Sequence, residues 1–377
     1  MILRAGRRME GIDRTLIRRI FDAAPKGAIN LGLGQPDLPT PPRICEAGIE
    51  GIRKGRTAYT STAGDPALRA AIAARYAPFA SAAENVVVTI GSQEAMFAVL
   101  MTLCDPGDEV LHPDPGYPAY PVVARLLGAS GVAFPLRAER GFRVDPDDVL
   151  SRITPRTRAV ILCSPSNPTG AIDRAEDLAR LAEGLRARGV AWISDEIYAG
   201  FAYDGPAPSI RAFSPDGGVV ISGLSKDLSM TGWRVGWACG ADAFIARVIA
   251  AHQYMVTCAS SVSQAAALAA FSGAHQAERS AYLEVFRRRR ALMAEELSRI
   301  EGLRFAMPDG AFYFFVDVSA FGDATPIAMR LLESRKVVTI PGEAFGSNAR
   351  GWLRISYAAS DADIVTGVRA LGEMLRG

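Results

Sequence analysis

Between residues 85 and 240, short apolar runs rich in β-branched residues alternate with longer stretches that carry a helical pattern. Residues 85–90 (NVVVTI), 159–163 (AVILC) and 190–194 (VAWIS) are the clearest of these runs. Strands that alternate with helices are typical of an α/β fold with a parallel sheet. We therefore expect a mostly parallel sheet flanked by helices. The other expected elements are strands at residues 109–112, 219–222 and 234–239, and helices at residues 92–103 and 175–188.

The C-terminal part of the chain follows a different pattern. A long helix is expected at about residues 278–299, then strands at 312–318, 337–340 and 352–356, and a helix at 361–375. A chain of 377 residues is also too long for one ordinary core. We expect a large domain and a smaller α+β domain that the N-terminal segment joins, because that segment precedes the α/β alternation. The expected division is residues 40–280 for the large domain and residues 1–39 with 281–377 for the small one.

Charge and composition exclude several classes of function. The formal net charge is only +2, which gives no electrostatic case for a nucleic-acid partner. The one basic run, Arg287 to Arg290, is interpreted as a solvated helix face. No stretch reaches the roughly 18 uninterrupted apolar residues of a membrane span. We expect a cytoplasmic protein without a membrane partner.

Metal chemistry is not expected either. The three histidines do not cluster, and the five cysteines are scattered without C-x-x-C spacing. A His/Cys metal site is therefore improbable, and no metal ligand is assigned.

The scarcity of lysine is more informative. Of 42 basic residues only four are lysines, namely Lys26, Lys54, Lys226 and Lys336. Arginine cannot form a Schiff base, because its guanidinium stays protonated and is a poor nucleophile. Three of the lysines lie beside Gly or Arg in polar surroundings, which is typical of surface residues. Lys226 lies in a weakly charged segment, and this favours a chemical role.

Polar residues follow each expected strand. In open α/β sheets, ligands bind beyond the carboxyl ends of the strands, so these residues are expected to meet at one edge. The segments are Gly91-Ser92-Gln93, residues 114–117 (DPGY), 164–170 (SPSNPTG), 195–198 (DEIY) and 223–226 (GLSK).

Together these segments meet the requirements of pyridoxal 5′-phosphate (PLP). A phosphate suits a helix N-terminus, which Gly91, Ser92 and Gln93 provide, and Arg234 can add a charged hydrogen bond. The aldehyde requires an amine, for which Lys226 is the candidate.

The ring of PLP has further requirements. Its pyridine nitrogen needs a buried carboxylate to stay protonated, and Asp195 is the candidate. Asn167 and Tyr198 can donate to the phenolic oxygen, and Tyr117 can stack on the ring.

The sequence resembles the class I/II aminotransferases of PLP fold type I, aspartate aminotransferase-like, over nearly its whole length. Six motifs occur in the family's order, namely residues 30–37 (NLGLGQPD), Tyr59 with Gly64 and Leu68-Arg69, residues 164–170, residues 194–198 (SDEIY), Ser225-Lys226 with residues 230–236 (MTGWRVG), and residues 353–356 (LRIS). The resemblance implies a PLP-dependent transaminase that moves the amino group of an L-amino acid to a 2-oxo acid.

The resemblance also implies roles for residues. Lys226 would be the Schiff-base lysine and catalytic base, with Asp195 and Tyr198 as the other catalytic residues. Arg354 would bind the substrate α-carboxylate together with Asn167, and Gly34 would belong to the loop that closes over substrate. Tyr59 would reach the phosphate of the neighbouring subunit's cofactor, which implies a homodimer.

Two positions depart from the family pattern. Many members have Ser or Thr three residues before the lysine, where this chain has Gly223, so Ser222 or Ser225 is the candidate replacement. Some aspartate-using relatives have Lys where this chain has Gln93. That difference reduces the case for a dicarboxylate-specific enzyme without excluding one.

Two other functions stay open. A β-elimination C–S lyase needs the same ring contacts on the same fold. A PLP-binding regulatory domain ranks lower, because such proteins carry a helix-turn-helix domain ahead of this fold and the glycine-proline loop here begins near residue 30. The amino donor and acceptor are not revealed by the sequence.

Overall fold

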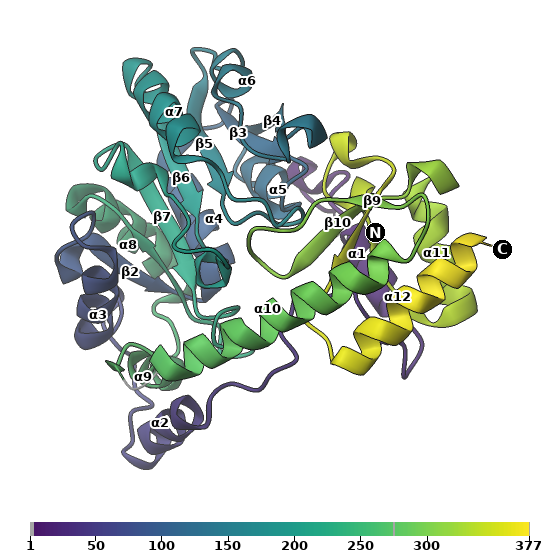
Figure 1. The fold of residues 1–377 in the computed structure, drawn as a ribbon. Helices are drawn as coiled ribbons and strands as arrows, with labels where there is room; N and C mark the ends of the chain where they lie inside the picture. Colours follow the sequence, from purple (N-terminus) through teal and green to yellow (C-terminus); the bar gives the residue numbers. More distant parts are fainter. Residues whose placement is uncertain (1–3, 274–275, 377) are drawn as a thin grey trace.

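The computed structural model describes residues 4–273 and 276–376, and its centre is a seven-stranded sheet (Figure 1). The strands lie in the order β2-β8-β7-β6-β5-β3-β4. Their bounds are β2 Val86–Thr89, β3 Glu109–Asp114, β4 Ser130–Pro135, β5 Thr157–Cys163, β6 Ala191–Asp195, β7 Gly218–Gly223 and β8 Gly236–Cys239. Neighbouring strands are parallel except for β8, which is antiparallel to both β2 and β7. The expected mostly parallel α/β sheet is confirmed.

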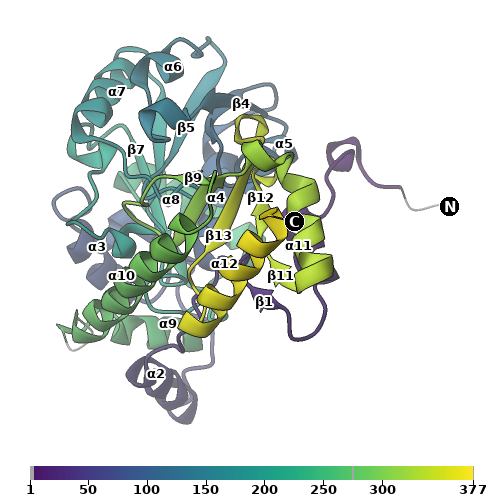
Figure 2. The ribbon, with the colours of Figure 1, turned by 45° about the vertical axis from the view of Figure 1, so that its right-hand side comes forward.

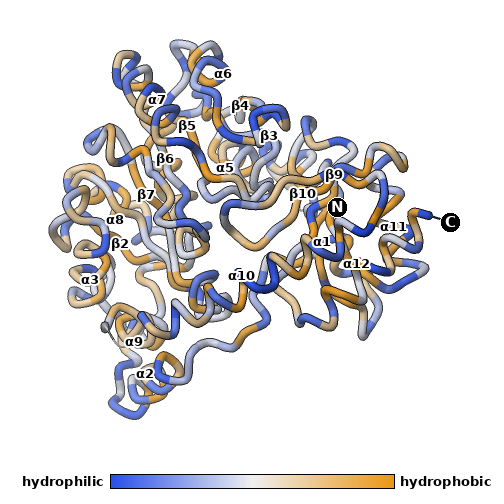
Figure 3. Tube along the Cα trace, in the orientation of Figure 1, coloured by the Kyte–Doolittle hydropathy of each residue, from blue (hydrophilic) through white to orange (hydrophobic). Residues whose placement is uncertain are grey.

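Both faces of this sheet are covered by helices, because its strands are apolar on both sides. In β5, Ala159 and Ile161 face one apolar core, whereas Val160 and Leu162 face another. Figure 3 shows the central strands as hydrophobic segments inside more polar helices. The helices of this part are α2 Pro42–Arg53, α3 Pro66–Tyr76, α4 Gly91–Leu103, α5 Ala119–Leu126, α6 Pro146–Leu150, α7 Ala175–Ala187, α8 Asp242–Val256 and α9 Ser261–Ala269.

The C-terminal part forms a second, smaller layer of sheet and helices. A four-stranded antiparallel sheet has the order β12-β13-β10-β9, and β1 pairs with β11 in a separate parallel pair. The strands are β1 Ile29–Asn30, β9 Arg304–Phe305, β10 Tyr313–Asp317, β11 Val337–Val338, β12 Ile340–Pro341 and β13 Trp352–Ser356. The helices are α1 Leu16–Ala23, α10 Gln276–Ser298, α11 Ala324–Arg335 and α12 Asp361–Arg376.

Several elements were not expected from the sequence, namely strands β1 and β9 and helices α1, α2, α3, α5, α6, α8, α9 and α11. Three further details also differ. The strand β4 was not expected, because its sequence SGVAFP contains Gly and Pro and it lies at the edge of the sheet. The expected strand at residues 337–340 is two strands, β11 and β12, which pair with different partners. The antiparallel direction of β8 was also not expected.

The basic run on α10 is not a solvated face throughout. Arg289 is buried and makes a bidentate ion pair with Asp37, at 2.6 and 2.9 Å between nitrogen and oxygen. Arg290 stacks over the ring of Tyr203, with 4.9 Å between guanidinium carbon and ring centroid. Only Arg287 and Arg288 are exposed. The prediction was wrong for half of the run because helix α10 packs on neighbouring segments along its inner side.

The division into two domains stays our proposal, and separate apolar cores support it. One core gathers residues of β10, β13, α10, α11 and α12, and a smaller one joins Ile20 of α1 to α11, β11 and β12. Two others lie on the faces of the large sheet, and one of these also includes Phe315 of β10. Residues Ile197, Tyr198, Phe201 and Tyr203 follow β6 but pack in the small-domain core. Helix α10 runs beside α12 in both views (Figures 1 and 2).

Within residues 4–273 and 276–376, no helix is both long enough and apolar enough to cross a membrane.

Candidate active site

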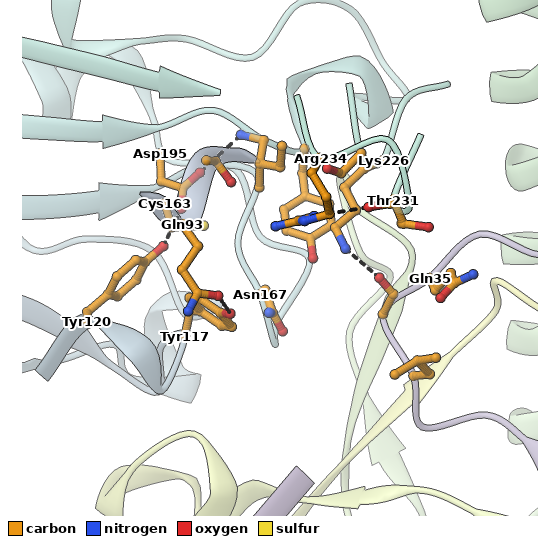
Figure 4. Close-up of a pocket in the computed structure, with 16 residues that line it drawn as sticks. Gln35, Gln93, Tyr117, Tyr120, Cys163, Asn167, Asp195, Lys226, Thr231 and Arg234 are labelled. Atoms are coloured by element: carbon orange, nitrogen blue, oxygen red, sulfur yellow. Dashed lines mark hydrogen bonds between the residues drawn. The ribbon is translucent and has the colours of Figure 1, made fainter. Parts of the chain in front are cut away.

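A cavity of about 270 Å³ lies at the carboxyl ends of the large sheet, where it meets the loop of residues 33–35 (Figure 4). Strand β6 ends at Asp195 and β5 ends at Cys163, and β7 ends shortly before Lys226. The cavity is lined by Leu33, Gly34, Gln35, Ser92, Gln93, Tyr117, Tyr120, Cys163, Asn167, Asp195, Ile197, Tyr198, Ser225, Lys226, Thr231 and Arg234. The structure thus brings together most of the residues that the sequence singled out.

The N-terminus of α4 and Arg234 form one wall of the cavity. Gly91 has φ +76°, a backbone conformation that side chains rarely adopt. A Cβ atom there would lie 2.7 Å from Nη2 of Arg234, so glycine allows the guanidinium to approach the helix end. Arg234 Nη1 donates to the Thr231 carbonyl at 3.0 Å. Ile90, before Gly91, provides no side-chain cap, so this helix end can receive an anion.

Lys226 places a reactive amine in the cavity. Its Nζ donates to the Gly34 carbonyl at 2.6 Å. Burial lowers the pKa of the Lys226 amine to about 8, and the guanidinium groups of Arg354 and Arg234 add to this, while Asp195 acts in the opposite direction. A larger share of this amine is therefore neutral, and able to act as nucleophile or base, than for a free lysine.

Asp195 is a buried carboxylate to which no arginine or lysine of residues 4–273 and 276–376 donates a hydrogen bond. Its Oδ2 accepts from the Tyr120 hydroxyl at 2.8 Å, and its Oδ1 accepts from the Ile197 N–H at 3.2 Å. Burial raises the pKa of the Asp195 carboxyl to about 6, although both hydrogen bonds act against this. An isolated buried carboxylate is costly, so this position suits a cationic ligand group.

Arg354 forms a second cationic group beside the cavity. Its guanidinium lies 4.4 Å from the ring centroid of Tyr313 and 4.6 Å from that of Phe345. Nη1 donates to Oδ1 of Asn167 at 2.8 Å, and Nη2 donates to the Gly32 carbonyl at 2.5 Å. Its buried Nε has no hydrogen-bond partner in the described part of the chain. An incoming carboxylate can satisfy such a donor.

Tyr198 is held by a residue from the small domain. Its hydroxyl lies 2.8 Å from the Tyr313 hydroxyl, and both side chains are buried. A Cβ atom on Gly34 would lie 2.2 Å from the Tyr313 hydroxyl, so the loop at this point requires glycine. Tyr198, Tyr313 and Gly34 therefore form one packed unit that joins the segment after β6 to β10.

Two functional side chains, Tyr120 and Tyr313, were missed by the sequence reasoning. Tyr120 follows Tyr117 by three residues, its N–H donates to the Tyr117 carbonyl at 3.1 Å and the two ring centroids lie 5.5 Å apart, so the short spacing was available as a signal. Tyr313 lies in a strand of the other domain, and no local pattern links it to the cavity.

The Gly223 departure has a steric explanation. A Cβ atom there would lie 2.8 Å from the Val235 carbonyl oxygen, so β8 leaves no room for a side chain. The Ser222 hydroxyl donates to the Glu196 carbonyl at 3.1 Å and does not line the cavity. Ser225 does line it, and this supports Ser225 as the replacement hydroxyl.

Three expected site residues do not line the cavity, namely Tyr59, Gly91 and Arg354, and Arg354 contacts the lining through Asn167. Tyr59 is 86 % exposed and lines a different surface pocket with Ser260. Within one subunit it is not brought to the cavity, and its expected role depends on a second subunit. Gly91 does not line the cavity itself but opens the helix that does.

The residues present fit PLP. A free helix N-terminus with Arg234 suits a phosphate, the half-buried amine of Lys226 suits an aldehyde, and the buried Asp195 suits a protonated ring nitrogen. Tyr117, whose hydroxyl donates to Oε1 of Gln93 at 3.1 Å, can contact the ring.

Comparison with known proteins agrees with this geometry. Residues 26–371 match the family profile described as aminotransferase class I and II. The chain is 37 % identical over 364 residues to a probable aspartate/prephenate aminotransferase of Aquifex aeolicus, covering 92 % of this chain and 91 % of that protein.

Solved structures give the same result. The aspartate aminotransferase of Thermus thermophilus with maleate has a TM-score of 0.92 at 32 % identity, covering 99 % of this chain and 100 % of that one. An aromatic aminotransferase from Pyrococcus horikoshii has a TM-score of 0.89 at 30 % identity, covering 96 % and 98 %.

Proposed function

This chain belongs to the class I and II aminotransferases, and we propose that it moves the amino group of an L-amino acid to a 2-oxo acid with PLP bound through Lys226. The observation that carries the proposal is that one cavity holds both a buried amine and a buried carboxyl. The pKa of the Lys226 amine is lowered to about 8, and the pKa of the Asp195 carboxyl is raised to about 6. Each shift reflects the cost of burying a charged group, and a ligand with an aldehyde and a cationic ring relieves both.

Each part of PLP has residues to hold it. The N–H groups of Gly91, Ser92 and Gln93, with Ser225 and Arg234, would bind the phosphate. The ring would be held by Asp195 at its nitrogen, by Asn167 and Tyr198 at its phenolic oxygen, and by Tyr117 on one face, as the cavity lining supports.

The chain's own groups supply orientation and proton transfer. When bound, PLP supplies an aldehyde that links covalently to amines and a ring that withdraws electrons from the substrate. Lys226 Nζ accepts the proton from the substrate Cα and later returns a proton, as base and then acid. Arg354 holds the α-carboxylate through a planar fork, which fixes the Cα–H bond relative to that amine.

Replacement of Lys226 tests this proposal directly. Lys226→Ala should abolish amino transfer to 2-oxoglutarate and the visible absorbance of covalently held PLP. Lys336→Ala, at an exposed lysine, is the control and should keep both. Full activity in Lys226→Ala would overturn the assignment.

A second assay, without a 2-oxo acid, distinguishes amino transfer from β-elimination. An aminotransferase needs a 2-oxo acid acceptor, whereas a C–S lyase releases pyruvate and ammonia from cystathionine without one. We expect no such release.

Family membership alone does not identify the amino donor or the oligomeric state. The relatives are named for aspartate, prephenate and aromatic substrates, so family membership leaves the donor open. We also propose a homodimer in which Tyr59 reaches the partner's cofactor, and the high exposure of Tyr59 in the single chain supports this.

A further inference from the structure

A second cavity of about 340 Å³ adjoins the active-site cavity. Leu33, Gln93 and Tyr117 line both, so the two cavities share a wall. These residues come from the loop after β1, the start of α4 and the segment before α5. A group that is too large for the first cavity can extend past this wall into the second.

The second cavity is mostly apolar. Helix α1 contributes Ile17 and Phe21, one helical turn apart, and the start of α5 contributes Pro118, Ala119 and Val122. The apolar side chains of α1 and α5 that line it are half-buried, so they present surface that a ligand can cover. Covering apolar surface removes it from water, which favours a ligand with an apolar side chain.

The charges at this cavity do not favour a second carboxylate on the ligand. The one cation that lines it in the described part of the chain, Arg18, is paired through Nε with Oδ1 of Asp22 at 2.9 Å. Its guanidinium carbon lies 5.5 Å from the ring centroid of Phe21 and its side chain is 63 % exposed. Asp13, a carboxylate, also lines the cavity and repels an anion.

We propose that the second cavity is the subsite for the donor's side chain, and that the donor is an L-amino acid with a large apolar side chain, such as L-phenylalanine or L-leucine. This rests on the proposed function, because the α-carboxylate and amino group must lie at Arg354 and Lys226. The shared wall of Leu33, Gln93 and Tyr117 is where the side chain passes.

Donor preference is the first test. With 2-oxoglutarate as acceptor, kcat/KM for L-phenylalanine should exceed that for L-aspartate. A preference for L-aspartate would overturn the inference and leave the proposed function intact. Failure of every donor would instead count against the proposed function.

Two isoleucines of α1, of which only Ile17 lines the second cavity, provide a matched pair. Ile17→Ala should lower kcat/KM for L-phenylalanine about tenfold, since loss of a few methylene contacts in an apolar pocket has effects of this size. The L-aspartate value should change little. Ile20→Ala is the control, because Ile20 does not line the second cavity, is 2 % exposed and packs with Leu332, Val338, Ile340 and Phe345. It should lower thermal stability and leave the ratio of the two donors unchanged. Equal effects of Ile17→Ala on both donors would overturn the subsite.

Val122 on α5 lines the same cavity and offers a second variant that leaves α1 unchanged. Val122→Phe on α5 should fill the second cavity and reduce kcat/KM for L-phenylalanine relative to L-aspartate. An unchanged ratio would contradict the proposal.

A binding measurement avoids turnover. Calorimetry on the PLP-loaded enzyme should show tighter binding of 3-phenylpropanoate than of succinate, which are phenylalanine and aspartate without their amino groups. The difference should be about tenfold or more, and Ile17→Ala should reduce it. Tighter binding of succinate would overturn the inference.

Discussion

At the scale of residues, the site contains ionisable groups whose burial destabilises the folded protein. Asp195 is 6 % exposed, and no arginine or lysine hydrogen-bonds to it in the described part of the chain. Buried charges of this kind raise the free energy of the folded state and are typical of functional sites.

Asp195→Asn should therefore stabilise the cofactor-free protein while it removes activity. The pKa of this carboxyl rises from 3.8 in the unfolded chain to about 6 in the fold. At low pH the group is protonated in both states and the substitution has no effect. Between about pH 4 and pH 6, ionisation of Asp195 increasingly destabilises the folded wild-type protein. Above pH 6 the free energy of unfolding of the variant should therefore exceed that of wild type by about 2–3 kcal/mol. Urea unfolding at pH 3.5 and pH 8 measures this, and an equal difference at both pH values would contradict it.

Lys226 gives a prediction about pH and cofactor uptake. Only the neutral amine attacks an aldehyde, and the pKa of Lys226 is lowered to about 8. The rate of covalent PLP capture by cofactor-free protein should rise through about pH 8 and then level off. In Lys226→Ala, the residual capture reports free surface lysines and should rise only near pH 10. The same pH profile in both proteins would argue against a special amine at this position.

Sequence reasoning identified the residues that follow strands because parallel strands end at one edge of a sheet. Asn167, Asp195, Tyr198 and Lys226 could be expected together for that reason. Tyr313 could not, since its contact with Tyr198 arises from packing between distant segments.

At the scale of elements, the loop that carries Lys226 is anchored by charges. The next residue, Asp227, is buried, with Oδ2 3.7 Å from Nη1 of Arg75 on α3 and 3.6 Å from Nε of Arg279 on α10. One carboxylate thus serves two arginines from helices on different parts of the chain. We propose that this cluster positions the Lys226 loop relative to α10.

The cluster predicts unequal effects on stability. Asp227→Asn leaves Arg75 and Arg279 close together without a counter-charge. It should lower the free energy of unfolding by about 2 kcal/mol. Arg279→Met leaves Asp227 paired with Arg75, so it should lower the free energy of unfolding by only about 1 kcal/mol or less. The free energy of unfolding in urea measures both. A larger loss from Arg279→Met would show that the arginine, not the carboxylate, is the centre of the cluster.

Most strands could be predicted from the sequence, because the buried strands are short, apolar and bounded by polar turns, but of the helices only α4, α7, α10 and α12 were expected. The edge strand β4 could not, since it lacks a continuous apolar run. The separation of β11 from β12 depends on which strands they pair with, and pairing partners are not encoded locally.

At the scale of the whole molecule, the proposed homodimer makes a prediction about hybrids. Lys226→Ala and Tyr59→Ala homodimers should each have low activity, because each lacks one contribution to every site. A mixture that exchanges subunits should regain about a quarter of wild-type activity, since half of the dimers are hybrids and each hybrid has one intact site. If mixing restores nothing, Tyr59 does not act across an interface.

The segment after β6 has a further consequence. Ile197, Tyr198, Phe201 and Tyr203 belong to the large domain by sequence and to the small-domain core by packing. A fragment of residues 40–280 expressed alone would expose these four side chains to water. An unrelated module in place of the C-terminal part would therefore have to rebuild the apolar surface that packs on Tyr198, three residues after Asp195.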